Sequence, residues 1–253
     1  MIRYTVIDSH LTMSSKTREA MIEFFEAVKG CGREKAELTA EFCALHFEKA
    51  FSVKWYEVLA RENGKIVGYI RCLRNPEDDT RWYICEVHVR PEYRNRGIAK
   101  RMYQKVMDEV AWYDNVKYMT ASVHPKNVNS VKLHESLNFI NTGHPCKFPG
   151  LDFEEGETEY ETKIYKSLGF PDNLDYAVPK IMPVWKEYLH TQGSKISDDA
   201  AREKLVKILK KALKGDCSFD TIWWGNELMG FDYWDGKQKE FYLKDGGNFD
   251  GKK

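Results

Sequence analysis

The residues with the clearest chemical potential are a cluster of cations around one glycine, Arg94-Asn95-Arg96-Gly97-Ile98-Ala99. Arginine carries a permanent positive charge, and glycine lets a ligand approach the main chain closely. A helix that starts here would add the unpaired N–H groups and the partial positive charge of its first turn. Helix starts of this kind bind phosphate groups. We therefore expect an anion-binding site from Arg94 to Ala99.

The segments on either side of this turn predict a strand before it and a helix after it. Residues 82–89 form an apolar, alternating run that ends at Arg90-Pro91-Glu92-Tyr93. Residues 100–110 have apolar side chains at helical spacing: Met102, Tyr103, Val106, Met107 and Val110. A strand, a basic glycine turn and a helix in this order are the elements that an anion site needs.

A second segment, residues 127–139, reads Asn-Val-Asn-Ser-Val-Lys-Leu-His-Glu-Ser-Leu-Asn-Phe. With the Arg-x-x-Gly-x-Ala turn, it resembles the GCN5-related N-acetyltransferase (GNAT) family, whose pattern here is Asn-x-x-Ala-x-x-Leu-Tyr-Glu-x-x-Gly-Phe. The resemblance implies an α/β acyl-CoA N-acyltransferase fold with a mixed sheet, and acetyl-CoA as the acyl donor. It also implies which residues bind CoA. Those at the pyrophosphate are Arg94, Asn95, Arg96, Gly97, Ile98 and Ala99, and Asn127 contacts the cofactor arm.

The second segment departs from the family pattern at three positions. Ser130 replaces a small alanine, and Asn138 replaces a glycine, which asparagine can do because it tolerates the left-handed conformation. His134 replaces the tyrosine that commonly protonates the leaving thiolate. An imidazole can also donate a proton near neutral pH, so His134 is the candidate acid. A helix histidine without a chemical role is the alternative.

Glu86 is the candidate general base. Amines are mostly protonated at neutral pH, so acetyl transfer to an amine requires a group that removes a proton, directly or through water. A carboxylate inside an otherwise apolar strand costs several kcal/mol unless it faces a cleft or a partner. Some relatives that acetylate small amines carry an acidic residue at this point of the strand. The alternative is an ion pair between Glu86 and a neighbouring Arg or Lys.

Main-chain groups of the same strand are expected to bind the donor. The resemblance implies that this strand bulges and splays from its neighbour near the thioester. N–H and C=O groups near Val87 and Val89 would then pair with the pantetheine amides, as an added strand does. An ordinary ladder strand is the alternative reading of these two residues.

The order of predicted elements is β, α, α, β, β, β, α, β, α, β, which is the layout of the acetyltransferase fold. It assigns residues 1–168 to a GNAT domain. Strands and helices are expected at 2–7, 14–28, 33–50, 56–60, 65–72, 82–89, 100–110, 118–123, 127–137 and 139–140. Residues 160–165 are a candidate for the last strand.

Residues 173–253 are predicted to form a smaller C-terminal α/β domain after a linker at 170–173. Two helices, at 180–190 and 198–214, precede a hairpin of 219–224 and 228–234. Leu228-Met229-Gly230-Phe231 aligns with Ile66-Val67-Gly68-Tyr69, which indicates a degenerate partial repeat of the first domain. An unrelated α+β appendage is the alternative. The exposed edges of a half-sheet make a homodimer plausible.

Composition narrows the class of protein. The 39 basic and 39 acidic side chains cancel, so no global field favours nucleic acid or a membrane surface. We find neither a membrane-spanning run nor a signal-peptide core and expect a cytoplasmic protein. The six cysteines show no metal-ligand spacing, which favours free thiols and no metal site.

The leading hypothesis is therefore an acetyl-CoA-dependent N-acetyltransferase that acts on the primary amine of a small molecule, by direct transfer in a ternary complex. A covalent intermediate on Cys85 is less favoured, because nothing in the sequence indicates a lowered thiol pKa. One alternative is a non-catalytic acyl-CoA-binding sensor. Another is an acetyltransferase for a protein N-terminus or lysine. The acidic stretch 154–161 would suit a cationic acceptor of either size.

Overall fold

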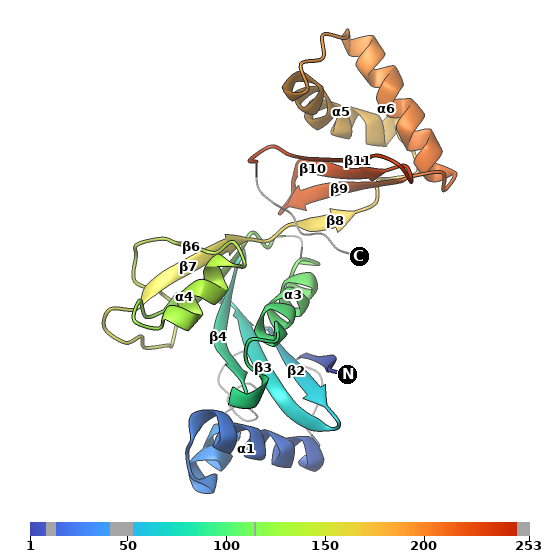
Figure 1. Cartoon of the computed structure of the whole chain (residues 1–253). Coiled ribbons are helices and arrows are strands. Elements are labelled where there is room, and N and C mark those ends of the chain that lie inside the picture. Colours follow the sequence, from blue (N-terminus) through green and yellow to red (C-terminus); the bar gives the residue numbers. More distant parts are fainter. Residues whose placement is uncertain (9–13, 41–52, 114, 247–253) are drawn as a thin grey trace. The chain divides into compact units, whose positions relative to one another are not determined.

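The computed structural model describes residues 1–8, 14–40, 53–113 and 115–246 of the chain. It divides into two compact units, Met1–Ile164 and Tyr165–Lys253, each with its own sheet (Figure 1). Each unit is described by itself below.

The first unit is built on a seven-stranded mixed sheet in the order β1-β2-β3-β4-β5-β7-β6. Only β4 and β5 pair in parallel, and every other neighbouring pair is antiparallel. The strands are β1 (Arg3–Asp8), β2 (Trp55–Glu62), β3 (Lys65–Arg74), β4 (Arg81–Val89), β5 (Tyr118–Val123), β6 (Ile140–Asn141) and β7 (Thr158–Lys163). The predicted α/β class and mixed sheet are confirmed.

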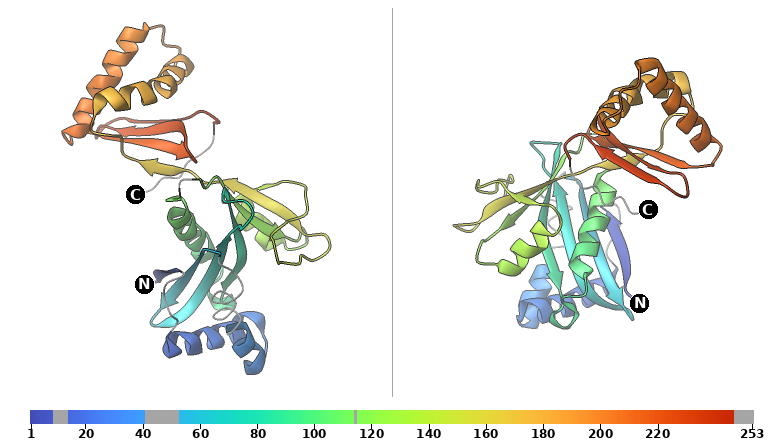
Figure 2. Two further views of the ribbon diagram at one scale, coloured as in Figure 1. Left: turned by 180° about the vertical axis from the view of Figure 1, so that it is seen from behind. Right: turned by 45° about the horizontal axis from the view of Figure 1, so that its top comes forward.

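Helices cover both faces of this sheet. On one face, α1 (Ser15–Lys29) packs Met21, Phe24 and Phe25 against buried side chains of β2 and β3. On the other face, α3 (Ile98–Val110) runs along β2 and β3 (Figure 2), and α4 (Val128–Glu135) belongs to the same side. A short 3-10 helix, η1 (Pro91–Tyr93), connects β4 to the turn before α3. We call these the α1 face and the α3 face.

Local signals in the sequence set several of these boundaries. Ser14 accepts a hydrogen bond from the N–H of Thr17 and caps α1, and Gly30 ends that helix in the left-handed conformation. Asn63 and Gly64 both have positive φ, the geometry of a tight hairpin between β2 and β3. Residues 33–40 are helical, as expected. The remainder of the helix predicted to residue 50 lies outside the described residues.

The second unit is a four-stranded antiparallel sheet in the order β11-β10-β9-β8 with two helices on one face. Its elements are β8 (Lys166–Leu168), α5 (Leu174–Thr191), α6 (Asp198–Leu213), β9 (Ser218–Trp224), β10 (Glu227–Trp234) and β11 (Lys239–Leu243). Trp185 and Tyr188 of α5 pack on Phe231 at the centre of the unit, with ring centroids 5.3 and 5.1 Å apart.

Two boundaries differ from the sequence expectation. Lys166–Leu168, which was placed in the first domain, pairs with β9 and belongs to the second sheet. Helix α5 starts six residues earlier than the predicted 180, because Asn173 caps it and the helix continues past Pro179 and Pro183. The sequence prediction began this helix directly after Pro179, because a proline removes a helix hydrogen bond.

Candidate active site

The basic turn is held open at the start of α3. Asn95 and Gly97 both adopt the left-handed conformation, with φ of 60° and 72°. Gly97 is the N-cap of α3, and among the residues that the structure describes no side chain caps this helix. A Cβ built on Gly97 would meet nothing within 4 Å. The missing side-chain cap and the open space at Gly97 leave room for an anion at the N–H groups of the first turn.

Two buried residues anchor this turn to the sheet. Ile98 is 2% exposed and packs so closely on Gly68 that a Cβ at Gly68 would lie 2.9 Å from Cγ2 of Ile98. Arg90 is 6% exposed and donates to the carbonyls of Ile66 at 2.7 Å and Glu23 at 3.1 Å. A fixed turn binds with little loss of conformational freedom.

The two arginines of the turn are exposed and keep their charges near it. Nε of Arg94 donates to the carbonyl of Val89 at 3.3 Å. Arg96 lies 3.5 Å from a carboxylate oxygen of Glu62, with its guanidinium over the ring of Tyr93. These contacts are weak enough, at the surface, for either cation to turn toward a ligand phosphate.

Strand β4 bulges and then leaves its parallel neighbour. Arg71 pairs with Glu86 and Cys72 pairs with Ile84, so Cys85 is the extra residue of a β-bulge. Pairing with β5 covers only Arg81–Ile84. From Cys85 to Val89, no described strand pairs with this edge of β4. The bulge and splay that the family resemblance implied are therefore present.

Hydrogen-bond alternation shows which groups line the open edge. The N–H of Arg90 donates to the carbonyl of Val67 on β3. In an antiparallel pair every second residue bonds to the neighbouring strand, so the main-chain groups of His88 and Glu86 also point toward β3. The N–H and C=O groups of Val87 and Val89 consequently point to the open edge. An extended ligand with amide groups could pair there and end at the Gly97 turn. The Val89 carbonyl, which already accepts from Arg94, keeps a second lone pair.

The bulge also determines which face Glu86 occupies. Tyr83 pairs with Leu73 and Glu86 pairs with Arg71, and residues 71 and 73 share one face of β3. Glu86 therefore lies on the α1 face together with Tyr83, although the two differ in parity along the sequence. Val87 and Val89 pack on the α3 face.

Glu86 is paired with cations on the α1 face. Its Oε1 lies 3.3 Å from Nζ of Lys29 and 4.0 Å from Nε2 of His88. Its Oε2 is buried and has no hydrogen-bond partner within the described part of the chain. Burial favours the neutral acid, but the hydrogen bond from His88 and the charge of Lys29 outweigh it. The pKa of Glu86 is therefore lowered, and the carboxylate is ionised at neutral pH.

A buried ion pair lies beside Glu86 in the same cross-strand row. Arg71 pairs in register with Glu57 on one side and Glu86 on the other. Arg71 and Glu57 are each 1% exposed; Nε of Arg71 donates to Oε1 of Glu57 at 2.8 Å, and Tyr69 donates to the same oxygen at 2.9 Å. Sequence reasoning missed this row, because only the strand register brings residues 57, 71 and 86 together.

His134 lies on the α3 face and is buried, at 2% exposure. Its Nδ1 lies 2.8 Å from the carbonyl of Ser130, which can only accept, so Nδ1 carries the proton. Nε2 then accepts from the hydroxyl of Tyr103 at 2.7 Å. Burial lowers the pKa of His134, and the bond to Ser130 offsets only part of that effect. The ring is therefore a neutral imidazole whose one N–H is already bonded.

Asn127 occupies the N-cap of α4, and its side-chain oxygen accepts from the N–H of Ser130 at 3.2 Å. The residue is exposed. Asn138, which replaces the family glycine, adopts φ of 62°, so the expected left-handed conformation is confirmed. Glu86 and His134 lie on opposite faces of the sheet, Glu86 on the α1 face and His134 on the α3 face.

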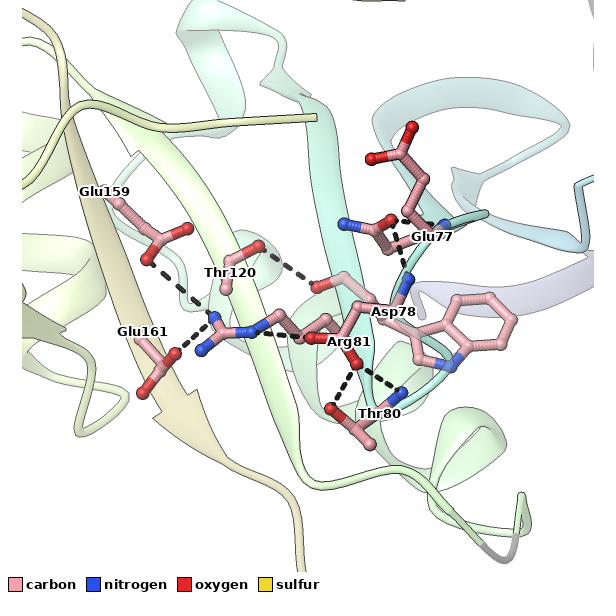
Figure 3. A network of polar contacts seen from close by, with 9 residues as sticks. Glu77, Asp78, Thr80, Arg81, Thr120, Glu159 and Glu161 are labelled. Atoms are coloured by element: carbon pink, nitrogen blue, oxygen red, sulfur yellow. Dashed lines mark hydrogen bonds and ion pairs between the residues drawn. The ribbon is translucent and has the colours of Figure 1, made fainter. Parts of the chain in front are cut away.

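Carboxylates of the predicted acidic stretch are used inside the first unit. Glu159 and Glu161 on β7 face Arg81 at the start of β4, and Arg81 also pairs with Asp78 (Figure 3). Glu157 accepts from the hydroxyl of Ser122 at 2.9 Å. The contacts of Arg81 join β4 to β7 at the end where β4 still pairs with β5, and the Ser122–Glu157 bond joins β5 to the start of β7.

No group of His, Cys, Asp and Glu side chains within the described ranges could hold a metal ion. The described cysteines are all free thiols. Among the helices that the structure describes, none has the length and apolar character to cross a bilayer.

A mixed sheet that opens beside a glycine turn is the arrangement of an acyltransferase-type fold. Comparison with known proteins identifies the family. A profile of the acetyltransferase (GNAT) family matches residues 18–139, and over these residues the chain belongs to that family. The class of enzyme is thus an acetyltransferase.

Relatives of known name match parts of the chain. An L-2,4-diaminobutyric acid acetyltransferase of Oceanobacillus iheyensis is 28% identical over 145 residues, 51% of this chain and 79% of the relative. A protein of the same name from Vibrio parahaemolyticus is 25% identical over 112 residues, 43% of this chain and 58% of the relative. A GNAT-family structure from Desulfovibrio desulfuricans, 14% identical, covers 65% of this chain and 99% of its own, with a TM-score of 0.50.

Proposed function

We propose that the protein transfers the acetyl group of acetyl-CoA to a primary amine of a small molecule, by direct transfer in a ternary complex. The observation that carries this proposal is the open edge of β4 ending at the uncapped turn of Gly97. The edge of β4 at Val87 and Val89 can pair with amide groups, and the Gly97 turn that follows it can bind phosphates. This is the order in which pantetheine and pyrophosphate occur in CoA.

The donor site follows from the main chain. The first-turn N–H groups after Gly97 bind the pyrophosphate, and Arg94 and Arg96 add charge. Val87 and Val89 pair with the pantetheine amides. Asn127, exposed at the start of α4, supplies a further polar contact. When bound, acetyl-CoA supplies an activated thioester carbonyl.

The acceptor approaches from the α1 face. Ionised Glu86 attracts an ammonium group and takes its proton, directly or through a water molecule, so that the free amine attacks the carbonyl. The side chain of Glu86 is 28% exposed, and its Oε1 atom already faces a nitrogen cation, Nζ of Lys29, at 3.3 Å. Relatives named for diaminobutyric acid, a small diamino acid, support a small amine as acceptor.

His134 remains the proposed source of the proton for the leaving sulfur. Its N–H is bonded to Ser130, so donation would require that bond to break. The same observation favours one second candidate function, an acyl-CoA sensor that binds the donor without transfer.

Thiol release separates the two functions. The purified full chain is mixed with acetyl-CoA and a panel of primary amines that includes L-2,4-diaminobutyric acid, and free thiol is measured. Amine-dependent release supports the transferase. Binding of acetyl-CoA without release by any amine of the panel would contradict it and favour the sensor.

A further inference from the structure

Lys29 places a primary amine directly against Glu86, the proposed base. It is the last residue of α1, and its side chain, 30% exposed, passes over the ring of Phe25 at 5.3 Å. Its Nζ lies 3.3 Å from Oε1 of Glu86. The left-handed Gly30 ends the helix directly after it and fixes the point from which the side chain extends.

Lys29 differs chemically from the other cations at Glu86. The charged groups that act on Glu86 are Lys29 of α1, His88 of β4 and Arg71 of β3. A guanidinium keeps its proton in proteins and is not a nucleophile, and Arg71 is fully engaged with Glu57. An imidazole does not form a stable amide. Of these three groups, only Lys29 carries a primary amine, the chemistry of the proposed acceptor.

We propose that Lys29 is an internal acceptor that is acetylated in cis when no free acceptor is bound. This inference rests on the proposed function, because the same base and donor would serve both acceptors. Glu86 takes a proton from the Nζ ammonium, and the amine attacks the thioester carbonyl. A C–N bond forms, the C–S bond breaks, and CoA leaves as the thiol after its sulfur gains a proton.

Acetylation would change the site that carries it out. The amide of acetyl-lysine has no charge, so the ion pair with Glu86 is lost and the bulkier group stays beside the carboxylate. A free acceptor and Lys29 would also compete for the same base. Self-acetylation should therefore be slowed by saturating acceptor.

Mass spectrometry of the full chain tests this inference. The wild type is incubated with isotope-labelled acetyl-CoA alone, and peptides are compared at Lys29 and at Lys16, an exposed lysine of the same helix. We expect labelled acetyl at Lys29 in at least tenfold excess over Lys16. The controls are Lys29→Arg, which keeps the charge, and Gly97→Glu, which should not bind the donor.

Equal labelling of Lys29 and Lys16, or undiminished labelling of Lys29 in Gly97→Glu, would show non-enzymatic acetylation and overturn the inference. An unlabelled Lys29 in a protein that releases thiol with a free amine would also overturn it, with the proposed function intact. The absence of both labelling and amine-dependent release would remove the proposed function as well.

A separate observation concerns the second unit. Its sheet order, β8-β9-β10-β11, matches the order β1-β2-β3-β4 in the first unit, and the neighbouring strands in both sets are antiparallel. In both units, two helices follow the first of these strands along the chain. In each, a bulge lies immediately before a glycine: Gly68 pairs with Ala60, and Gly230 pairs with Ile222. The residue after each glycine, Tyr69 or Phe231, is fully buried against the first helix.

The ends of the two half-sheets correspond as well. The N–H of Arg90 donates to the carbonyl of Val67 at 3.0 Å. The N–H of Lys244 donates in the same way to the carbonyl of Met229 at 3.0 Å. In the first unit the anion turn follows. In the second, Asp245 and Gly246 follow, and residues 165–253 contain no Arg-x-x-Gly-x-Ala motif.

We infer that the second unit is a degenerate copy of the first half of the acetyltransferase fold, without its donor site. One acetyl-CoA should then bind per chain in calorimetric titration, and a crystal structure should show the bulge at Met229. Two equivalents of acetyl-CoA per chain, or an unbulged pairing of β9 with β10, would overturn the inference.

Discussion

The hydroxyl of Tyr103 donates a hydrogen bond to Nε2 of His134 across 2.7 Å, between α3 and α4. The direction is fixed because the other ring nitrogen donates to a carbonyl. Both side chains are buried, and burial raises the pKa of Tyr103 while it lowers that of His134. Both groups therefore stay neutral, and their first role is to hold the two helices that border the donor site.

Replacing Tyr103 with phenylalanine should destabilise the protein by about 1–3 kcal/mol, because Nε2 of His134 is left buried without a donor. Urea unfolding measures this loss. The control is Tyr176→Phe, an exposed position where we expect a change within about 0.5 kcal/mol. Equal stability of Tyr103→Phe and the wild type would contradict a buried hydrogen bond between Tyr103 and His134.

Glu86→Gln should lower kcat with a good amine acceptor by about 10²- to 10⁴-fold, the range for a general base. Affinity for acetyl-CoA should stay within twofold, since the proposed donor contacts are main-chain groups of Val87 and Val89 and the Gly97 turn, not the side chain of Glu86. Steady-state kinetics and calorimetry measure the two quantities. Glu92→Gln, which removes an exposed carboxylate paired with Lys65, serves as the control. An undiminished kcat in Glu86→Gln would remove Glu86 from the mechanism.

The ionised Glu86 should also make a pH-dependent contribution to stability. Its folded-state pKa is lowered, so its contribution is present above the unfolded pKa of about 4.3. It is lost as the pH falls through the folded pKa. The wild type should therefore exceed Glu86→Gln in stability most at neutral pH, and the difference should shrink below about pH 4. Denaturant unfolding from pH 3 to 7 tests this, and a constant difference would contradict the lowered pKa.

Arg71→Met should cost about 3–5 kcal/mol, because Glu57 is left as a buried, uncompensated charge. The double variant Glu57→Leu/Arg71→Met should recover most of the loss, since it removes both charges. The matched control is Arg33→Met, which breaks an exposed pair with Glu19 and should cost less than about 1 kcal/mol. If the double variant were no more stable than Arg71→Met, the ion pair would not explain the loss.

Much of the fold could be predicted because its signals are local. The Asn63–Gly64 turn, the Ser14 cap and the Gly97 helix start each depend on a few adjacent residues, and the structure places all three as expected. The acetyltransferase family was recognised from the same kind of local motif. Strand β8 was misplaced, because its partner, β9, lies more than 50 residues further along the chain.

The site was less predictable than the fold. The face of Glu86 depends on the bulge at Cys85, and its partners Lys29 and Arg71 come from other elements. Likewise, the bond between Tyr103 and His134 requires the packing of α3 on α4. These contacts follow from register and packing over long sequence separations, which a periodic pattern does not encode.

The most direct test of the proposed transferase is calorimetric titration of acetyl-CoA into the wild type and Gly97→Glu. The glutamate would put negative charge against the pyrophosphate. Gly143→Glu is the matched control, since Gly143 has φ of 76° and equally open space at its Cβ. We predict one equivalent of acetyl-CoA bound by the wild type and by Gly143→Glu, and an at least hundredfold weaker affinity in Gly97→Glu. Equal binding by Gly97→Glu, or no binding by the wild type, would contradict the donor site on which the account depends.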